Sequence, residues 1–391
     1  MSATPILECI ACGGSDLVSV LDLGEQPLAN SYREDPNEVL PKYPLAINRC
    51  VDCSHVQLTH QVDPQEMFDD YLYVSGTSKT QRDYFSWFAD LTIELFGIGP
   101  SMVLDIGCND GSQLDEYKKR GLHTCGVDPA KNLLATSSKN HDVHCGYYTG
   151  DEFFGKFDII TCQNAFAHNI DQLALMKNVQ KNMHSHSLFF ATVSQAHMIE
   201  RDEFDTIYHE HVSFYCVRSA LAMAERSGLH LVDVFEHEIH GGSYIFVFSK
   251  QDVQHQSIIT LTDRERKIGL YDDEIYDQYA KNCLDRIDRF RDLVNDCKSI
   301  MGCFTVGYGA PAKGSVLLNA SGVHLPVIFE DNPLKVGRYV PGTMTKIMPS
   351  AELAYEPNAI VIPLAWNFHD EIFKKVQSIN PTAVVLDLRD I

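Results

Sequence analysis

The sequence predicts an α/β chain in which a small metal-binding module precedes two lobes built on parallel sheets. Two Cys-x-x-Cys pairs lie near its start, which is typical of a module folded around a metal ion. Two apolar strands, in segments 101–111 and 303–314, each run into a glycine turn, which is typical of a doubly wound sheet. The 391 residues are enough for several cores. We expect the module over residues 1–70, a central lobe over 71–252 and a last lobe over 253–391.

The composition narrows the classes of partner. Hydrophobic residues make up 45% of the chain, as in globular proteins. Lys and Arg total 32 against 53 Asp and Glu, a formal net charge of −21, which argues against binding to nucleic acid or to an anionic membrane. No apolar run approaches the roughly 20 residues that cross a bilayer, and segment 1–14 lacks a signal-peptide core. We therefore expect a cytoplasmic protein whose cysteines are reduced or bind metal.

The two cysteine pairs are Cys9 with Cys12 and Cys50 with Cys53. Four thiolates from two such pairs close a tetrahedral zinc site that leaves no position open for water. The alternatives are two unrelated pairs of buried thiols, or a redox pair, which would need to follow a strand in a βαβ unit. A closed site would fold about the first 60 residues and take no part in catalysis.

The segment "SMVLDIGCNDG" predicts the first strand of the central lobe, with Asp105 at its end and Gly107 in the turn. The next strand ends at Asp128, 21 positions after Gly107. In a doubly wound sheet such a glycine lets the backbone approach a ligand, and the second acid accepts hydrogen bonds from ribose hydroxyls. A nucleoside-type cofactor is therefore implied. The text is not G-x-G-x-x-G. It looks like the first motif of Rossmann-like S-adenosylmethionine (SAM) methyltransferases, with an ordinary strand–turn–helix as the alternative.

The rest of this lobe follows the same pattern. Residues 157–162 predict a fourth strand that breaks into a loop containing Asn164 and His168. The segment "SLFFATVSQ" predicts a fifth strand, and residues 229–250 predict a terminal hairpin. After it, residues 255–300 have the mixed three- and four-residue spacing of an amphipathic helix.

The second glycine turn supports a competing interpretation. Gly307, Gly309 and Ala312 satisfy a loose G-x-G-x-x-A pattern, and acids follow at Glu330 and Asp331. On its own this is a candidate NAD site, so an NAD-dependent nucleotide-sugar oxidoreductase or epimerase is the alternative function. Such turns also arise wherever a strand packs closely on a helix, and a search for bound nicotinamide would discriminate the two.

Taken together, the motifs resemble one family, the SAM-dependent C-methyltransferases that act on nucleotide-linked keto-deoxysugars. The resemblance runs along the whole chain, through the cysteine pairs and "LDLGEQPLAN", "YPLAINRCVDCSHVQL", "YLYVSGTS", "VLDIGCNDGS", "NAFAHN", "YHEH", "HGGS", "GYGAPAKG" and "GRYVPGT". It implies a zinc domain, a central Rossmann-like SAM domain and a C-terminal Rossmann-like domain that helps bind the sugar nucleotide. The implied substrate is a dTDP-linked 4-keto-6-deoxyhexose methylated at carbon 3, and the second glycine turn becomes a relic or a substrate cradle.

The segment "FDTIYHEHVSFY" is where this chemistry is expected. Methylation at carbon needs a base that removes a proton next to a ketone, a contribution of about 3–5 kcal/mol, and a group that stabilises the enolate oxygen. A neutral histidine is the natural base near pH 7. The resemblance places Tyr208, Glu210 and His211 at the active site, with His211 as base. Glu210 has the alternative role of orienting His211 by a hydrogen bond, and His209 is expected to be a structural neighbour.

Further residues complete the predicted site. The resemblance adds His168 and a tyrosine, Tyr71 or Tyr73, and we assign Tyr73 to catalysis and Tyr71 to the substrate. The predicted cofactor residues are Asp105, Gly107, Asn109, Asp128 and Asn164. Lys313 and Arg338 are predicted to meet the diphosphate of the sugar nucleotide through charge-assisted bonds. The chain departs from the family at Ile245, where arginine is frequent, and this puts the sugar's identity in doubt. We expect a monomer.

Overall fold

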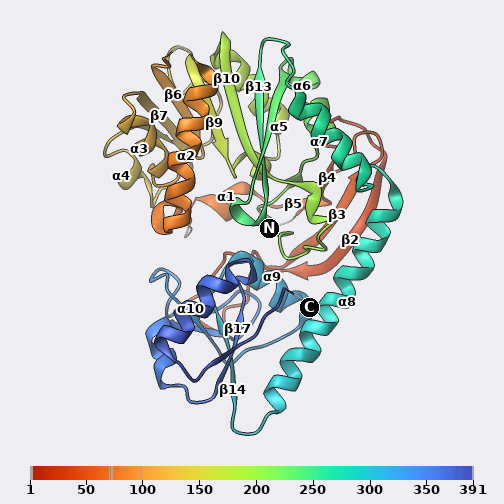
Figure 1. Cartoon of the computed structure of the whole chain (residues 1–391), viewed down its shortest axis with the longest axis vertical. Coiled ribbons are helices and arrows are strands. Elements are labelled where there is room, and N and C mark those ends of the chain that lie inside the picture. Colours follow the sequence, from red (N-terminus) through yellow and green to blue (C-terminus); the bar gives the residue numbers. More distant parts are fainter. Residues whose placement is uncertain (1–2, 70, 72–73, 98, 390–391) are drawn as a thin grey trace.

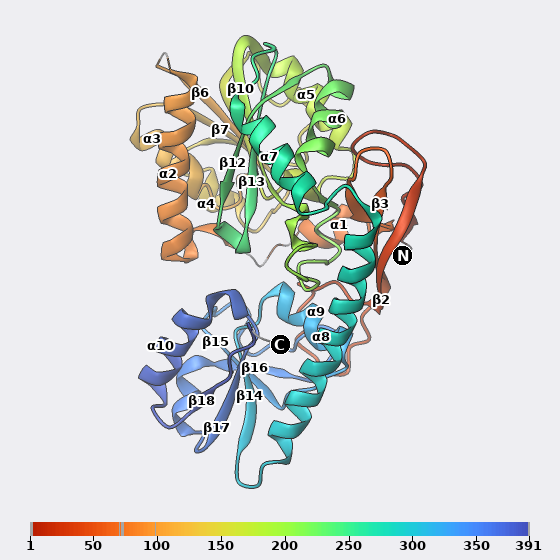
Figure 2. The same ribbon diagram turned by 45° about the vertical axis from the view of Figure 1, so that its right-hand side comes forward.

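The computed structural model describes residues 3–69, 71, 74–97 and 99–389 (Figure 1). The central lobe lies above the last lobe in this view, and a side wall joins them. That wall consists of the N-terminal strands β2 (Leu17–Gln26) and β3 (Tyr43–Cys50) and the long helix α8 (Asp273–Ser299). The turned view in Figure 2 shows α8 beside β2, with its other end descending along the last lobe.

The N-terminal module is a four-stranded antiparallel sheet in the order β11-β4-β3-β2. Its inner strands are β3 and β4 (Val56–Leu58), and one of its edge strands, β11 (Ser213–Phe214), comes from the central lobe. The strand β11 starts two residues after His211, so the sequence that carries this histidine is tied into the module's sheet. The module is completed by β1 (Thr4–Pro5), β5 (His60–Gln61) and the short helix α1 (Pro64–Phe68).

The central lobe contains a seven-stranded sheet in the order β12-β13-β10-β9-β6-β7-β8, with β13 antiparallel to both of its neighbours. Successive residues of a strand point to opposite faces, so Val103 packs with the helix α2 while Leu104 packs with the helices on the other side. Both faces are buried, which explains why these strands are nearly continuous apolar runs. The strands are β6 (Met102–Ile106), β7 (His123–Asp128), β8 (Asp142–Cys145), β9 (Phe157–Gln163), β10 (Met183–Ser194), β12 (His230–His237) and β13 (Ser243–Ser249). The helices are α2 (Lys79–Phe96), α3 (Ser112–Lys119), α4 (Leu134–Ser137), α5 (Gln172–Asn182) and α6 (Val217–Ser227).

The last lobe is a five-stranded parallel sheet in the order β16-β15-β14-β17-β18, so it is doubly wound as predicted. Its strands are β14 (Phe304–Tyr308), β15 (Val327–Glu330), β16 (Lys346–Pro349), β17 (Ala359–Pro363) and β18 (Val384–Val385). The helices α9 (Ala312–Ser321) and α10 (His369–Ile379) belong to this lobe. Short 3-10 helices complete the fold: η1 (Ser75–Thr77), η2 (Phe166–His168), η3 (Ala196–Met198), η4 (Ile239–Gly241), η5 (Ser350–Tyr355) and η6 (Trp366–Phe368).

The amphipathic segment predicted over residues 255–300 contains two helices. The first, α7 (Gln256–Lys267), ends before Gly269, whose φ of +80° suits glycine, and α8 follows. Ile258 and Leu261 of α7 pack into the core of the central lobe. The helix α7 belongs to the predicted last lobe by sequence but packs on the central lobe, and β11 belongs to the central lobe by sequence but pairs with the N-terminal sheet. The predicted domain boundaries stay predictions. In the part of the chain that the structure describes, no helix is long and apolar enough to cross a bilayer.

Candidate active site

The four predicted zinc ligands converge in the N-terminal module. The Sγ atoms of Cys9 and Cys53 lie 3.5 Å apart, as do those of Cys12 and Cys50, and all four Sγ atoms lie within 4.8 Å of one another. A tetrahedron with Zn–S bonds of about 2.3 Å has edges of about 3.8 Å, whereas a disulfide is about 2.05 Å long. The donor set therefore fits zinc and no disulfide is formed.

The two Cys-x-x-Cys turns also contact the part of the chain that follows His211. The side chain of Arg226 donates to the carbonyls of Ile10 and Ala11, both at 3.0 Å. The ring of His55, two residues after the last ligand, contacts the hydroxyl of Ser213 at 3.0 Å. Ser213 also accepts from Gln172 at 2.9 Å, so module and central lobe share one buried polar network.

The first glycine turn is shaped by close packing as well as by its predicted ligand. Gly107 has a φ of +78°, and a Cβ placed there would lie 2.5 Å from the Cβ of Ala165. Asp105 is 3% exposed and accepts from Thr161 at 2.6 Å, and burial raises its pKa to about 7. It therefore lies beneath the turn. Asp128 is less buried and ends β7 beside this turn.

Asp128 and Asn109 organise the rim of this site. Asp128 accepts from the backbone N–H of Asn109 at 2.8 Å and of Ala130 at 2.9 Å, and burial raises its pKa. Asn109 has a φ of +49°, and its Oδ1 accepts from the backbone N–H of Ser75 at 2.9 Å. Asn164 also has a positive φ, +52°, and its N–H donates to the carbonyl of Thr192 at 2.9 Å. The predicted cofactor residues thus lie at the carboxyl ends of β6, β7 and β9, where such sheets bind ligands.

His211 is held in one tautomer. Its Nδ1 lies 2.9 Å from the carbonyl oxygen of Thr206, so Nδ1 carries a hydrogen and donates it. The Nε2 lone pair is then an acceptor, and the hydroxyl of Tyr208 lies 2.7 Å from it. Burial lowers the pKa of His211 well below its ordinary value, with a further lowering from His168. A neutral imidazole with a directed lone pair is what a general base requires.

His168 lies against His211, with ring centroids 5.1 Å apart. Its other neighbour is Phe68, whose ring stacks on it at 5.7 Å. Burial lowers the pKa of His168 to about 4, so it is also neutral. The N–H of Val212 donates to the carbonyl of Ala167 at 3.0 Å and keeps the two histidine segments together.

Glu210 has partners other than His211. Its carboxylate is 4% exposed and accepts from Asn30 at 2.6 Å and from the Tyr71 hydroxyl at 2.7 Å, while burial raises its pKa. The interpretation that Glu210 orients His211 is therefore wrong, because Thr206 and Tyr208 do so. Sequence reasoning missed Asn30, which ends the quoted segment "LDLGEQPLAN". His209 is buried and contacts the carbonyl of Tyr43 at 3.3 Å, as a structural neighbour would. The predicted catalytic residue Tyr73 lies outside the described residues.

Lys313 of the last lobe faces the central lobe. A Cβ on Gly241, in the turn between β12 and β13, would lie 3.6 Å from its Nζ. The same Nζ lies 5.7 Å from the ring centroid of Trp366, and the Trp366 indole N–H donates to Asp205 at 2.6 Å. Arg338, the second predicted substrate cation, lies 3.7 Å from Glu34.

The acids of the second glycine turn hold that turn together. Glu330 accepts from the N–H of Ala310 at 2.7 Å and from two further backbone N–H groups. Asp331 accepts from Tyr308 at 2.9 Å and from Ser350 at 2.5 Å. Both acids therefore have structural hydrogen-bond partners within the protein, and their presence does not require a nicotinamide ligand.

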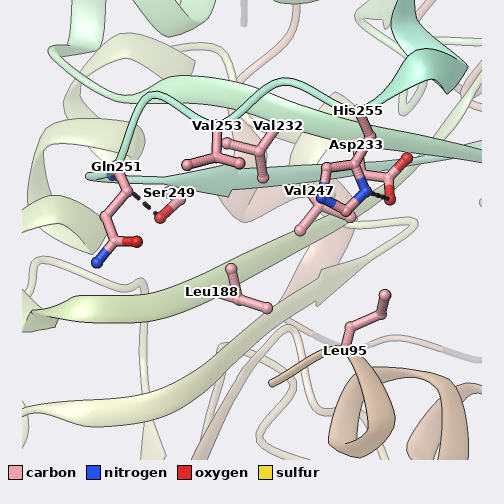
Figure 3. Close-up of a pocket in the computed structure, with 9 residues that line it drawn as sticks. All are labelled: Leu95, Leu188, Val232, Asp233, Val247, Ser249, Gln251, Val253 and His255. Carbon is pink, nitrogen blue, oxygen red and sulfur yellow. Dashed lines mark hydrogen bonds and ion pairs between the residues drawn. The ribbon is translucent and has the colours of Figure 1, made fainter. Parts of the chain in front are cut away.

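Two further features lie away from this candidate site. Ile245 is fully buried in the core beneath α2. A hollow with a mainly apolar lining is formed by Leu95 of α2, Leu188 of β10 and residues of β12, β13 and the segment that follows them (Figure 3). Among its lining residues, Nδ1 of His255 lies 2.8 Å from a carboxylate oxygen of Asp233.

Comparison with known proteins identifies the chain. Family models match three consecutive segments: a zinc binding domain over residues 9–68, a methyltransferase domain over 78–234, and a C-methyltransferase C-terminal domain over 238–384. C-methyltransferase NovU of Streptomyces niveus is 29% identical over 385 residues, which are 94% of this chain and 91% of that protein. The chain belongs to the SAM-dependent C-methyltransferases.

Other similarities of this C-methyltransferase are confined to part of its length. A ubiquinone biosynthesis O-methyltransferase of Coxiella burnetii is 28% identical over 152 residues, and the match spans 34% of this chain and 64% of that protein, less than two thirds. A SAM-dependent methyltransferase from Clostridium acetobutylicum aligns with 44% of this chain and 92% of that structure, at 12% identity and a TM-score of 0.37. Magnesium protoporphyrin IX methyltransferase from Synechocystis aligns with 46% of this chain and 88% of that structure, at 10% identity and a TM-score of 0.36.

The predicted family, the three-part α/β fold class and both cofactors of this C-methyltransferase, SAM and a structural zinc, are confirmed. The segment that contains the second glycine turn matches a C-methyltransferase domain, so the oxidoreductase alternative falls away. The sugar, the methylated carbon and the roles of the site residues stay predictions.

Proposed function

We propose that this C-methyltransferase methylates carbon 3 of a dTDP-linked 4-keto-6-deoxyhexose, through an enolate, to make a branched deoxysugar. The observation that carries this proposal is the tautomer of His211: Thr206 fixes Nδ1 as the donor, so the proton-accepting atom is Nε2, which accepts from Tyr208 in this structure. A base of this kind is needed for carbon methylation, because a carbon next to a ketone must lose its proton before it becomes a nucleophile.

In this proposal His211 and His168 have different roles. His211 takes the proton from the carbon next to the ketone, the C–H electron pair forms the carbon–carbon double bond of the enolate, and the ketone oxygen takes the negative charge. SAM, when bound, supplies an electrophilic methyl group. Tyr208 releases its hydrogen bond to Nε2 as the substrate proton arrives, and His168, neutral and 5.1 Å away, is placed to donate to the enolate oxygen.

The diphosphate is assigned to the last lobe. Lys313 is half-buried at the first turn of α9, and among the described residues it makes no ion pair, so its charge is available to a ligand. A phosphate at this turn would also meet the unpaired N–H groups at the start of the helix. Arg338, which lies 3.7 Å from Glu34 of the N-terminal module, is the second cation of this proposal.

The test is a panel of nucleotide-linked 4-keto-sugars, each incubated with SAM and followed by mass spectrometry. We expect one substrate to gain one methyl group, which carbon NMR locates on carbon 3. Transfer to a sugar oxygen, or no transfer to any keto-sugar, would contradict the proposal. We also propose a cytoplasmic monomer, and sedimentation velocity that shows a stable dimer would contradict the second part.

A further inference from the structure

A small polar pocket adjoins His211 at the carboxyl end of β10. Thr206, whose carbonyl fixes His211, lines it, and so does Gly241, which abuts Lys313. The pocket therefore lies between the proposed base and the cation of the last lobe. Its polar lining comes from residues that the sequence analysis did not single out, together with the histidine of the "HGGS" motif: Ser194, Gln195, Arg201, Glu203 and His240.

Gln195 is the unusual member of this pocket. Its side chain is 5% exposed, and its Oε1 has no hydrogen-bond partner in the described chain. Its Nε2 packs so closely on the turn that a Cβ on Gly242 would lie 2.6 Å away. Gln172, which is also buried, has partners at both ends of its amide: it donates to Ser213 and accepts from Tyr215.

Buried amide oxygens are almost always paired, because an unpaired one costs free energy. An exception that lines a pocket beside a reactive group indicates a missing ligand. Here the missing partner must donate a hydrogen bond, since an amide oxygen only accepts.

The other charges of the pocket support a donating ligand. Glu203 adds a second acceptor, and burial raises its pKa. Arg201 lies 4.0 Å from Glu203, but its guanidinium already donates to the carbonyl of Gly241 at 2.7 Å. His240, in the same turn, has a φ of +59°, a conformation that is uncommon for a residue with a side chain and frequent at ligand sites.

We propose that this pocket is a specificity subsite for a hydrogen-bond-donating substituent of the methyl acceptor, a hydroxyl or an ammonium group on the sugar, received by Gln195 and Glu203. The proposal rests on the proposed function, since it adds a substituent to the same keto-sugar. Gln195 then distinguishes substrates, because an acceptor without the substituent leaves its carbonyl unpaired.

One test needs no substrate. In Gln195→Met the amide is replaced by an apolar side chain of similar size, so the unpaired carbonyl is removed, and we expect the melting temperature of the zinc-loaded full chain to rise by about 2 °C. Gln172→Met is the matched control: it removes a paired amide and should lower the melting temperature. A fall for Gln195→Met as large as that for Gln172→Met would show that Gln195 already has its partner, and would overturn the subsite.

The second test compares two nucleotide keto-sugars that differ only in the donating substituent. Wild-type enzyme should prefer the substituted sugar by at least about 100-fold in kcat/KM, and Gln195→Met should reduce this preference to within about 5-fold. Glu203→Gln should impair an amino sugar more than a hydroxy sugar, which identifies the substituent. An unchanged preference in Gln195→Met would refute the subsite. A wild-type enzyme that methylates neither sugar would instead refute the proposed function, with the melting comparison still deciding whether Gln195 lacks a partner.

Discussion

The substitution His211→Asn separates the chemistry of the imidazole from its place in the loop. The amide nitrogen of asparagine lies where Nδ1 of histidine lies, so it can still donate to the carbonyl of Thr206, now 2.9 Å from Nδ1. The Nε2 atom, 2.7 Å from the Tyr208 hydroxyl, has no counterpart in asparagine. The variant therefore keeps the bond that shapes the loop and loses the lone pair that would accept the substrate proton.

The expected loss follows from these two bonds. Removing a general base costs about 10²–10⁴-fold in rate, or about 3–5 kcal/mol of barrier. Removing the Tyr208–Nε2 hydrogen bond costs about 1 kcal/mol of folding free energy. The effect on rate is thus several times larger than the effect on stability, and a folded variant with little activity is expected.

The assay is exchange of the acidic hydrogen of the keto-sugar in heavy water, with a SAM analogue that cannot transfer its methyl group. In the proposed mechanism proton removal precedes methyl transfer, so wild-type enzyme should exchange this hydrogen for deuterium. His211→Asn should lose exchange and methylation to the same degree and retain SAM affinity within about 2-fold. His168→Asn is the matched control, because it should slow both steps and still exchange. Exchange at the wild-type rate in His211→Asn would refute the reasoning and make Tyr208 or His168 the base.

Three further predictions concern pH, SAM and zinc. The folded protein lowers the pKa of His211 well below 6.5 and that of His168 to about 4, so the unfolded chain binds more protons below pH 6.5. Calorimetry should therefore show stability falling from pH 6.5 towards 4, and the acid limb of kcat/KM should lie well below pH 6.5. A limb at 6.5 would show an exposed histidine base. Asp128→Asn should weaken SAM binding about 10-fold in titration calorimetry, because the amide offers only one acceptor oxygen and two backbone N–H groups already face this side chain; unchanged affinity would place the ribose elsewhere. Cys50→Ser should lose about one zinc per chain by atomic absorption and unfold at a lower temperature, and a zinc-free variant as stable as wild type would contradict a structural metal.

The fold could be predicted from sequence wherever a local pattern sets it. The apolar run that ends at Asp105 specifies a buried strand, and Gly107 specifies the turn, whatever the rest of the chain does. The same reasoning does not predict what Gly107 packs against, since the Cβ of Ala165 belongs to another strand–loop unit. Nor does it predict β11, because two residues have no periodicity and pair with a strand about 150 residues earlier in the chain.

The sequence indicated which residue types would gather in the candidate site, but it indicated their contacts less well. A dense run such as "YHEH" indicates proton chemistry, and the structure does bring His211 beside His168. Sequence proximity suggested that Glu210 orients its neighbour, but consecutive residues of an irregular loop point in different directions. One partner of Glu210 is Asn30, 180 positions away, and Nδ1 of His211 bonds to a backbone carbonyl, which leaves no trace in the sequence.

The N-terminal module contacts the proposed catalytic loop, even though its four-cysteine site leaves no position open on a bound zinc. Its sheet includes β11, its knuckle holds Ser213 through His55, and its Asn30 binds Glu210, so three contacts from one module act on the few residues around His211. Loop residues without such contacts would sample many conformations. A base can be held within reach of the substrate carbon only if most of these loop conformations are excluded. A structural metal next to the catalytic loop provides this order locally, because its binding free energy is folding free energy for the segment it closes. These contacts support a view of the zinc module as the part of the fold that holds the proposed catalytic loop around His211 in place.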